Sequence, residues 1–289
     1  MRDGGESGEV AMTGDATAAL RWQDLGLSPV AFDLGPLPVR WYALAFLATF
    51  LLGGWYLRRL LREPGAPMRP ELVDDLFLYA VAGVILGGRL GYATFYQPGL
   101  WAAPLELVQP WHGGMSFHGG LIGLLIGLTL FARNHGVPLL RLLDYVGCAT
   151  PFGMILVRLA NFVNGELWGR PTTLPWGMVF PGAGDGVPRH PSQLYEALLE
   201  GVVMLLLLGF LFWRTGARHV PGRLAGAGLT WYAVARFSLE WVRQPDRGLE
   251  HLSWGLTMGQ TLSVPILFGG LALLILPPRI GTVRHPAGA

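Results

Sequence analysis

The sequence has no lysine, a single cysteine and few charged residues. Its 21 basic residues are all arginines, which excludes a lysine Schiff base and a lysine general base. The one cysteine, Cys148, excludes an internal disulfide framework and a zinc site built from cysteines. The net charge of +2 is too small to indicate a nucleic-acid partner. Charged residues make up 14 % of the chain, against about 25 % in a soluble domain, so there is too little polar surface to cover a soluble particle.

Apolar residues are abundant instead. Hydrophobic residues make up 52 % of the 289 residues, and the mean hydropathy is +0.42. This composition predicts an integral membrane protein and excludes a disordered chain. A bilayer-spanning helix needs about 20 mostly apolar residues. The stretches that meet this requirement are 41–57, 76–96, 113–132, 142–162, 193–213, 224–241 and 252–276.

These seven spans are expected to be helices. Every backbone polar group must be satisfied within the protein in lipid, and the alternating pattern of barrel strands is absent. We therefore predict an all-α integral membrane protein with seven transmembrane helices and a periplasmic loop or head region. Two neighbouring spans carry glycines at every fourth position, which places them on one face and allows close helix packing. These glycines are Gly83, Gly87 and Gly91, then Gly119, Gly123 and Gly127.

The seven-helix membrane domain is predicted to occupy residues 36–280. Residues 1–35 form a polar, partly disordered extension without an apolar h-region, so we expect no cleavable signal peptide. Residues 281–289 form a short tail. One set of connections holds 11 arginines and the other holds 7. The positive-inside rule then places the N-terminus outside, the tail in the cytoplasm and the long connection 161–191 in the periplasm.

Charged residues within the spans mark one end of the predicted bundle. In this orientation Arg158, Arg236 and Glu240 lie toward the outer ends of their helices. Tyr232, Arg236, Glu240 and Arg243 follow a single helical stripe. Such a stripe is unstable against lipid and should face a protein interior or a wet cavity. The alternative is an Arg236–Glu240 ion pair that only locks helices together.

Five further Asp, Glu, Arg or His residues lie within the spans. His118 and Glu196 are near outer helix ends. Asp144, Arg89 and Glu200 are close enough to helix ends to reach polar surroundings at low cost. A structural role and a functional role fit these last three equally well.

The connection 161–191 is long and has no helical pattern. Asn161, Asn164, Glu166 and Arg170 crowd its start, and glycines and prolines interrupt the rest. A loop of this length is usually functional or disordered, and its tryptophans argue against disorder. A purely structural cap is the alternative. Because arginine forks match phosphate geometry, the residues indicate a site for a phospholipid head group at the outer leaflet.

No metal site and no cofactor are expected. His112 and His118 lie in a glycine-rich stretch without a cysteine or carboxylate at ligand spacing. No serine lies in a GxSxG elbow. If the protein is an enzyme, its nucleophile therefore comes from a substrate.

Four sequence blocks resemble one family of membrane enzymes. They are GGMSFHGGLIG at 113–123, RLANFVNGELWGRPT at 158–172, RHPSQLYEALLEG at 189–201 and ARFSLEWVRQPD at 235–246. Together with PVRWYAL at 38–44, they are similar to the prolipoprotein diacylglyceryl transferases, and the similarity extends over about residues 30–276. The NGELWGR string is highly specific. This sequence differs from the family pattern in its polar N-terminal extension and in the short tail after Arg279.

The resemblance implies a bacterial inner-membrane enzyme with seven helices and no metal or soluble cofactor. In this family a diacylglyceryl group moves from phosphatidylglycerol to the lipobox cysteine in the signal peptide of a prolipoprotein. A thioether forms and glycerol 1-phosphate leaves. The implied partners are phosphatidylglycerol, the prolipoprotein signal peptide and membrane lipids, and no nucleic acid.

The resemblance also implies roles for matched residues. His118 corresponds to the family's essential histidine and is the candidate base for the substrate thiol, with an arginine-polarised group as the alternative. Arg158 and Arg236 correspond to the catalytic arginines that hold the lipid phosphate and neutralise the leaving group. Glu240 is expected to orient Arg236, with Arg243 assisting. The other predicted phosphatidylglycerol-binding residues are Tyr42, Asn161, Asn164, Glu166 and Gly169.

Two other functions compete with this one. A membrane transporter of a lipid or peptide would explain a polar outer-leaflet cavity but not the NGELWGR string, and the chain shows no internal repeat. A non-catalytic scaffold would tolerate the loss of His118 and Arg236. Lipid turnover by the purified protein distinguishes these alternatives.

Overall fold

The computed structural model describes residues 20–109, 111, 113–245 and 255–276. The expectations for residues 1–19 and 277–289 lie outside this part of the chain. The long helices are α1 (Trp41–Leu61), α2 (Val73–Phe95), α4 (Phe117–Asn134), α5 (Leu139–Val163), α7 (Met204–Arg214), α8 (Arg223–Leu239) and α9 (Met258–Ile275). Helix α7 is continuous with the short α6 (Ser192–Glu196) through a π-helical segment, η6 (Ala197–Val203). The remaining short helices are η1 (Trp22–Leu25), η2 (Pro70–Leu72), η3 (Pro98–Ala102), α3 (Pro104–Leu107), η5 (Pro181–Ala183) and η7 (Ala217–His219).

The helical membrane fold is confirmed, but the number of spans differs. Within the described residues, 6 helices are long and apolar enough to cross a membrane, whereas the sequence predicted seven. The expected span 224–241 folds as α8, which has 17 residues and carries small residues and Arg236. Its length and composition therefore fall short of a self-sufficient span. Residues 113–116 and 255–257 were also predicted within spans but precede the helices α4 and α9.

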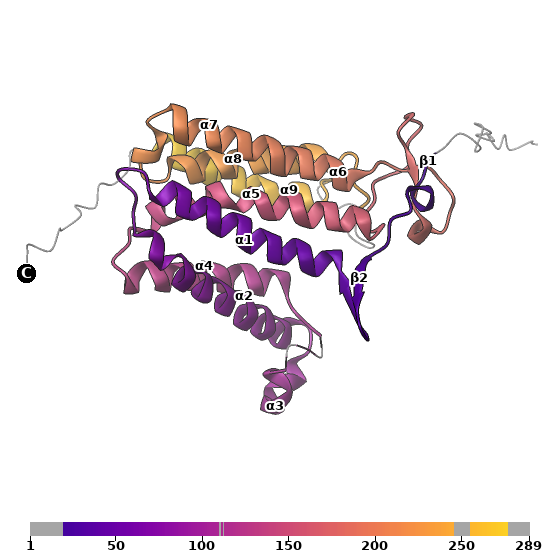
Figure 1. Cartoon of the computed structure of the whole chain (residues 1–289), viewed down its shortest axis with the longest axis horizontal. Coiled ribbons are helices and arrows are strands. Elements are labelled where there is room, and N and C mark those ends of the chain that lie inside the picture. Colours follow the sequence, from indigo (N-terminus) through magenta and orange to yellow (C-terminus); the bar gives the residue numbers. More distant parts are fainter. Residues whose placement is uncertain (1–19, 110, 112, 246–254, 277–289) are drawn as a thin grey trace, which may run out of the picture.

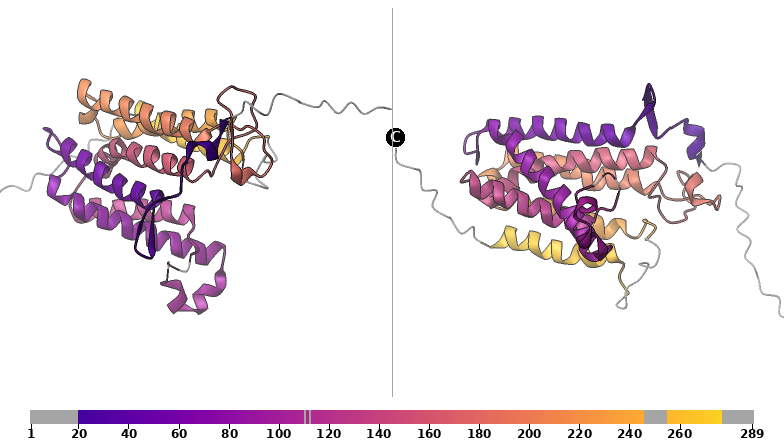
Figure 2. Two further views of the ribbon diagram at one scale, coloured as in Figure 1. Left: turned by 45° about the vertical axis from the view of Figure 1, so that its right-hand side comes forward. Right: turned by 90° about the horizontal axis from the view of Figure 1, so that it is seen from below.

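The helices run roughly along one common direction (Figures 1 and 2). Helices α2 and α4 form a pair on one side of the bundle, and α7, α8 and α9 form the other side, with α1 and α5 between them (Figure 1). Because the chain reverses direction at each connection, the N-terminus of α4, the C-terminus of α5 and the N-terminus of α6 share one end of the bundle. This end also carries β1 and β2, and we call it the head end (Figure 1).

The glycine trios bring α2 and α4 into backbone contact, as predicted. A Cβ atom added at Gly87 would overlap the carbonyl oxygen of Gly119, and one added at Gly123 would overlap the carbonyl oxygen of Gly83. Only glycine leaves room for this approach. Because lipid is as apolar as the side chains, the two helices are held together mainly by close van der Waals packing.

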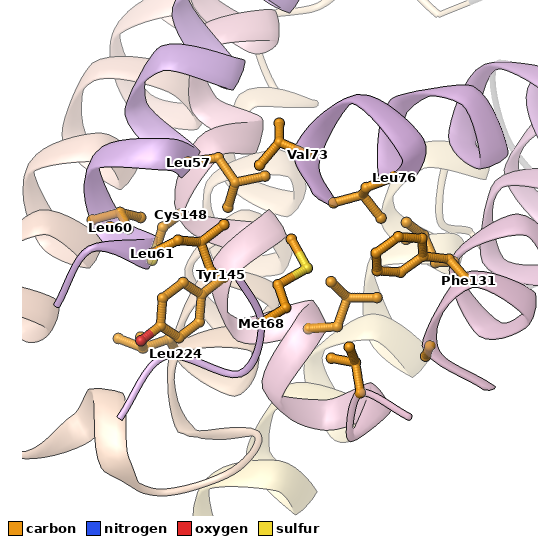
Figure 3. Packing of buried hydrophobic residues seen from close by; sticks show 14 of the residues in the cluster. Leu57, Leu60, Leu61, Met68, Val73, Leu76, Phe131, Tyr145, Cys148 and Leu224 are labelled. Carbon is orange, nitrogen blue, oxygen red and sulfur yellow. The ribbon is translucent and has the colours of Figure 1, made fainter. Parts of the chain in front are cut away.

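The largest hydrophobic cluster lies toward the opposite end of the bundle. Leu57, Phe131, Tyr145 and Cys148 are fully buried there and pack together with residues from α2, α7 and α8 (Figure 3). Asp144 lies beside this cluster and has a structural role. Its carboxylate accepts hydrogen bonds at 2.8 Å from the backbone N–H groups that begin α8, so it caps that helix instead of reaching the interface.

Short strands build the head end. Strand β1 (Leu20–Arg21) pairs in parallel with β4 (Met178–Val179), and β2 (Val30–Leu34) forms a hairpin with β3 (Leu37–Arg40). The indole of Trp22 donates to the carbonyl of Phe162 at 2.7 Å. Residues 20–25 of the predicted polar extension therefore take regular structure, and residues 20–22 contact the end of α5 and the loop that follows it.

Candidate active site

Six charged side chains of alternating sign meet inside the head end of the bundle, and we call them the arginine–glutamate cluster. Its members come from α5, α6, η6 and the C-terminal end of α8 with the residues that follow. They are Arg158, Glu196, Glu200, Arg236, Glu240 and Arg243. The charges balance, as the cost of burying an unpaired ion requires.

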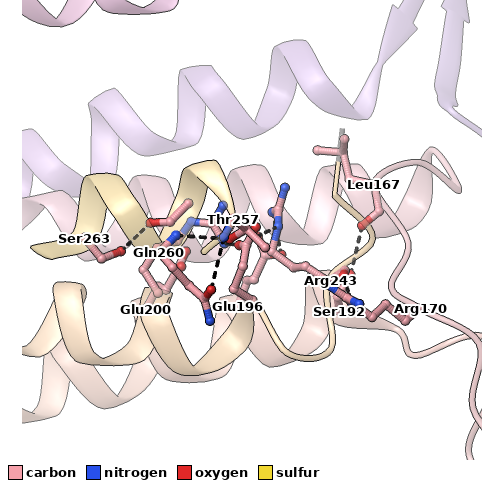
Figure 4. Close-up of polar contacts among 12 residues, drawn as sticks. Leu167, Arg170, Ser192, Glu196, Glu200, Arg243, Thr257, Gln260 and Ser263 are labelled. Carbon is pink, nitrogen blue, oxygen red and sulfur yellow. Dashed lines mark hydrogen bonds and ion pairs between the residues drawn. The ribbon is translucent and has the colours of Figure 1, made fainter. Parts of the chain in front are cut away.

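Glu196 lies at the centre of this cluster (Figure 4). One carboxylate oxygen is 2.7 Å from Nε of Arg158, and the other is 2.8 Å from a terminal nitrogen of Arg243. Arg158 also lies 4.0 Å from the carboxylate of Glu200, whose second oxygen has no hydrogen-bond partner among the described residues. Glu196 thus joins α5 to the segment that follows α8.

Arg236 and Glu240 form the second part of the cluster. They are one helical turn apart and 2.7 Å from each other, and Glu240 is also 3.7 Å from Nε of Arg243. Gly259 of α9 packs directly on this pair, because an added Cβ would lie 2.6 Å from the Glu240 carboxylate and 2.9 Å from the Arg236 guanidinium. The Arg236–Glu240 ion pair, which the sequence offered as the alternative, therefore exists, but it belongs to a larger network.

The arginines and the glutamates of the cluster differ in solvent exposure. The arginine side chains are 13–23 % exposed, whereas those of the three glutamates are 1–5 % exposed. The carboxylates therefore lie behind the guanidinium groups and hold them from the buried side. An anion that approaches from the accessible side meets arginine N–H donors first.

A second group of polar residues lies one helical turn further along α5. Nδ2 of Asn161 donates to the Glu166 carboxylate at 2.8 Å and to the hydroxyl of Tyr42 at 3.4 Å. Nδ2 of Asn164 donates to the same Glu166 oxygen at 3.3 Å. We call these four residues the amide cluster. Asn161 follows Arg158 by three positions, so the two clusters occupy neighbouring positions on one helix face.

The loop that follows α5 is tied to the end of α8. The N–H of Gly169 donates to the carbonyl of His190 at 2.8 Å, and Nε of Arg170 donates to the carbonyl of Arg243 at 2.9 Å. A Cβ at Gly169 would overlap the carbonyl oxygen of Val242. Gly169 therefore contributes close packing behind Arg243, and the loop fixes this arginine. Burial lowers the pKa of the His190 imidazole in the same loop, which favours its neutral form.

His118 lies apart from both clusters. It is in the first turn of α4 at the same end of the bundle, and its side chain is exposed and contacts the ring of Phe117. In the part of the chain that the structure describes, no hydrogen bond or ion pair connects His118 to the arginine–glutamate or amide cluster. Arg89 has a structural role nearby. Its guanidinium donates to four backbone carbonyls in residues 106–114, the segment that leads into α4.

Sequence reasoning missed the central residue. Glu196 was noticed as a polar group in a span but not predicted as part of the site, and Glu200 was left open. Carboxylates inside apolar spans are costly and are a sign of a site, yet their partners are set by contacts between helices. Over the described residues, no group of three metal-ligating His, Cys, Asp or Glu side chains is present.

Comparisons with known proteins agree with these motifs. The profile of the family "Prolipoprotein diacylglyceryl transferase" matches residues 29–276. A protein of Zymomonas mobilis named phosphatidylglycerol–prolipoprotein diacylglyceryl transferase is 50 % identical over 268 residues, which cover 89 % of this chain and 93 % of the relative. A protein of Erythrobacter litoralis with the same name is 44 % identical over 283 residues, which cover 96 % of this chain and 100 % of the relative.

Proposed function

The chain belongs to the prolipoprotein diacylglyceryl transferase family, and we propose that its arginine–glutamate cluster binds the phosphate of the lipid substrate. The protein is an enzyme that transfers a diacylglyceryl group from phosphatidylglycerol to a prolipoprotein. A carbon–sulfur bond forms between the glyceryl carbon and the acceptor thiol. The carbon–oxygen bond to the phosphate breaks, glycerol 1-phosphate leaves, and the thiol proton passes to a base.

The observation that carries this proposal is the exposed side of the three arginines. Arg158, Arg236 and Arg243 hold guanidinium groups in fixed positions, because Glu196 and Glu240 bind them from behind. A phosphodiester has two free oxygens, which two guanidinium forks can bind in a planar, bidentate manner.

The same arrangement stabilises the leaving group. As the carbon–oxygen bond breaks, negative charge grows on the phosphate. Arginines that are already oriented lower the energy of this charge without reorganising, and one such donor contributes about 2.7–4 kcal/mol. We assign this role to Arg158 and Arg236, with Glu240 orienting Arg236 and Arg243 assisting.

His118 is the proposed base for the thiol. An imidazole is a common general base and can accept a thiol proton within hydrogen-bond distance. The position of His118 at the head end and its exposure leave its ring accessible to a substrate. A group polarised by an arginine is the competing assignment.

The acceptor and the location follow from the same proposal. The acceptor thiol is the lipobox cysteine of a signal peptide, and the protein is a multi-pass protein of the bacterial inner membrane. The head end, including the loop 161–191, faces the periplasm, and the chain's C-terminus lies in the cytoplasm. Residues 36–280 then form the membrane domain, after an extension at 1–35 and before a tail at 281–289.

The decisive test uses purified protein, phosphatidylglycerol micelles and a lipobox peptide. We expect the peptide mass to rise by one diacylglyceryl group as an equal amount of glycerol 1-phosphate appears. A peptide in which serine replaces the lipobox cysteine is the control and should remain unmodified. An unmodified peptide in this assay, together with lipid movement across the bilayer when the same protein is reconstituted in vesicles, would support a transporter and overturn the proposal.

A further inference from the structure

The amide cluster contains hydrogen-bond acceptors that face no donor. Asn161 and Asn164 both donate Nδ2 to Glu166. An ionised carboxylate only accepts hydrogen bonds, so this contact fixes the orientation of both amides. Their Oδ1 atoms must then point away from Glu166. Both oxygens are buried and lack a hydrogen-bond partner among the described residues.

A third buried acceptor lies against the same loop. Nε2 of Gln193 donates to the backbone carbonyl of Glu166 at 2.5 Å, and the Gln193 side chain is fully buried. Its Oε1 atom also has no partner in the described part of the chain. Buried acceptors without donors are rare because each one costs free energy. Several of them around one loop indicate that a ligand supplies the missing donors.

Tyr42 adds a donor to this set. Its hydroxyl accepts a hydrogen bond from Asn161 at 3.4 Å and keeps its own proton. The group therefore offers several acceptors and one hydroxyl donor. This combination suits a ligand whose hydroxyls both donate and accept, such as a vicinal diol.

The position of the cluster identifies which diol. Asn161 follows Arg158 by three residues, so its side chain lies beside the proposed phosphate-binding arginine on α5. In phosphatidylglycerol the head-group glycerol is attached directly to the phosphate and carries two hydroxyls. We propose that Tyr42, Asn161, Asn164 and Glu166 bind these hydroxyls and thereby select phosphatidylglycerol over phospholipids without head-group hydroxyls. This inference rests on the proposed function and adds that the amide cluster binds the head-group hydroxyls of the substrate.

The test compares two lipids that differ only in these hydroxyls. Transfer to the lipobox peptide is measured from phosphatidylglycerol and from phosphatidyl-1-propanol with identical acyl chains. The propanol head group has the same carbon chain but leaves the amide oxygens without donors. We expect the wild-type protein to use phosphatidylglycerol at least tenfold faster, since a site built for hydroxyls rejects an analogue that lacks them.

Variants of the amide cluster then show which residues cause the preference for phosphatidylglycerol over phosphatidyl-1-propanol. Asn164→Leu and Tyr42→Phe should lower the ratio of the two rates severalfold toward one, with both proteins melting as the wild type does. Asn134→Leu is the matched control. Asn134 donates to Tyr79 at 2.8 Å at the opposite end of α4, so its replacement should leave the ratio unchanged.

The outcomes separate the two proposals. No transfer from phosphatidylglycerol by the folded wild-type protein would overturn the proposed function. Transfer from both lipids at equal rates would overturn the hydroxyl site alone. A wild-type ratio retained in both Asn164→Leu and Tyr42→Phe would overturn the assignment to these residues. Equal transfer rates from phosphatidylethanolamine and phosphatidylglycerol would show that Glu166 binds an ammonium group. This result would also overturn the hydroxyl site.

Discussion

Nε of Arg158 lies 2.7 Å from a Glu196 carboxylate that is almost fully buried. Glu196 also binds Arg243 through its other oxygen, so one carboxylate neutralises two arginines from different segments. This sharing explains how three arginines can lie together inside a membrane protein. It also makes Glu196 the residue on which the cluster depends most.

Glu196→Gln is expected to destabilise the protein and abolish transfer. The amide keeps the shape of the side chain but leaves Arg158 and Arg243 without a shared negative charge. Breaking a buried ion pair typically costs about 3–5 kcal/mol, which a melting experiment in detergent will detect. Asp185→Asn is the control, because the Asp185 carboxylate is exposed and such a pair contributes about 1 kcal/mol or less. Its partner Arg189 also keeps hydrogen bonds to the carbonyl of Gly169 and to Gln244. Equal melting temperatures for the two variants would contradict the central role of Glu196.

Gly259→Ala should lower activity while the protein remains folded. The new Cβ would lie within 3 Å of both Glu240 and Arg236. These contacts are with the ends of flexible side chains, so the ion pair moves and the helices stay in place. Gly269→Ala on the same helix is the control, since no atom lies within 4 Å of its added Cβ. We expect at least a tenfold loss of turnover in Gly259→Ala and none in Gly269→Ala, measured per folded protein. Wild-type turnover in both would show that the pair's position is unimportant.

The sequence predicted those features of the site that repeat along a single helix. The spacing of Arg236 and Glu240 by one turn was sufficient to predict their ion pair, and the glycines of α2 and α4 predicted close packing. The contact between Arg158 and Glu196 joins helices that are distant in the sequence, so no local pattern contains it. The π-helical segment η6, which contains Glu200, is also not encoded by the helical periodicity of the sequence.

The loop residue His190 predicts a pH-dependent stability. Burial lowers the pKa of its imidazole below the ordinary value, so folding favours the neutral ring. Its contribution to stability is complete above the unfolded pKa, near 6.5, and is lost as the pH falls toward the lower folded value. The melting temperature of the wild type should therefore fall between pH 7.5 and pH 5 more than that of His190→Gln. Parallel curves for the two proteins would contradict this prediction.

Topology and the role of the only cysteine can be tested together. Cys148 is fully buried in the hydrophobic cluster, almost three helical turns before Arg158 on α5, so Cys148→Ala should retain transfer activity. In that background, Thr173→Cys introduces a thiol at an exposed position of the loop 161–191. We expect an impermeant maleimide to label it from the periplasmic side of intact cells. Labelling only after the inner membrane is opened would reverse the proposed orientation.

The strongest test of the phosphate site is Arg236→Lys. Lysine keeps the positive charge, and a pairing with Glu240 is still possible, so a purely structural ion pair would survive with little change in melting temperature. Lysine lacks the planar fork that binds two oxygens of one phosphate. If Arg236 holds the phosphate as the carbon–oxygen bond breaks, turnover per folded protein should fall by a factor equivalent to about 2–4 kcal/mol, as for other preorganised donors. Arg158→Lys should behave in the same way, whereas Arg214→Lys, on an exposed residue at the far end of α7, should retain full turnover. Near-wild-type turnover in both Arg158→Lys and Arg236→Lys would remove the phosphate-binding role and leave only an ion-pair network that fastens α5, α6 and α8 together.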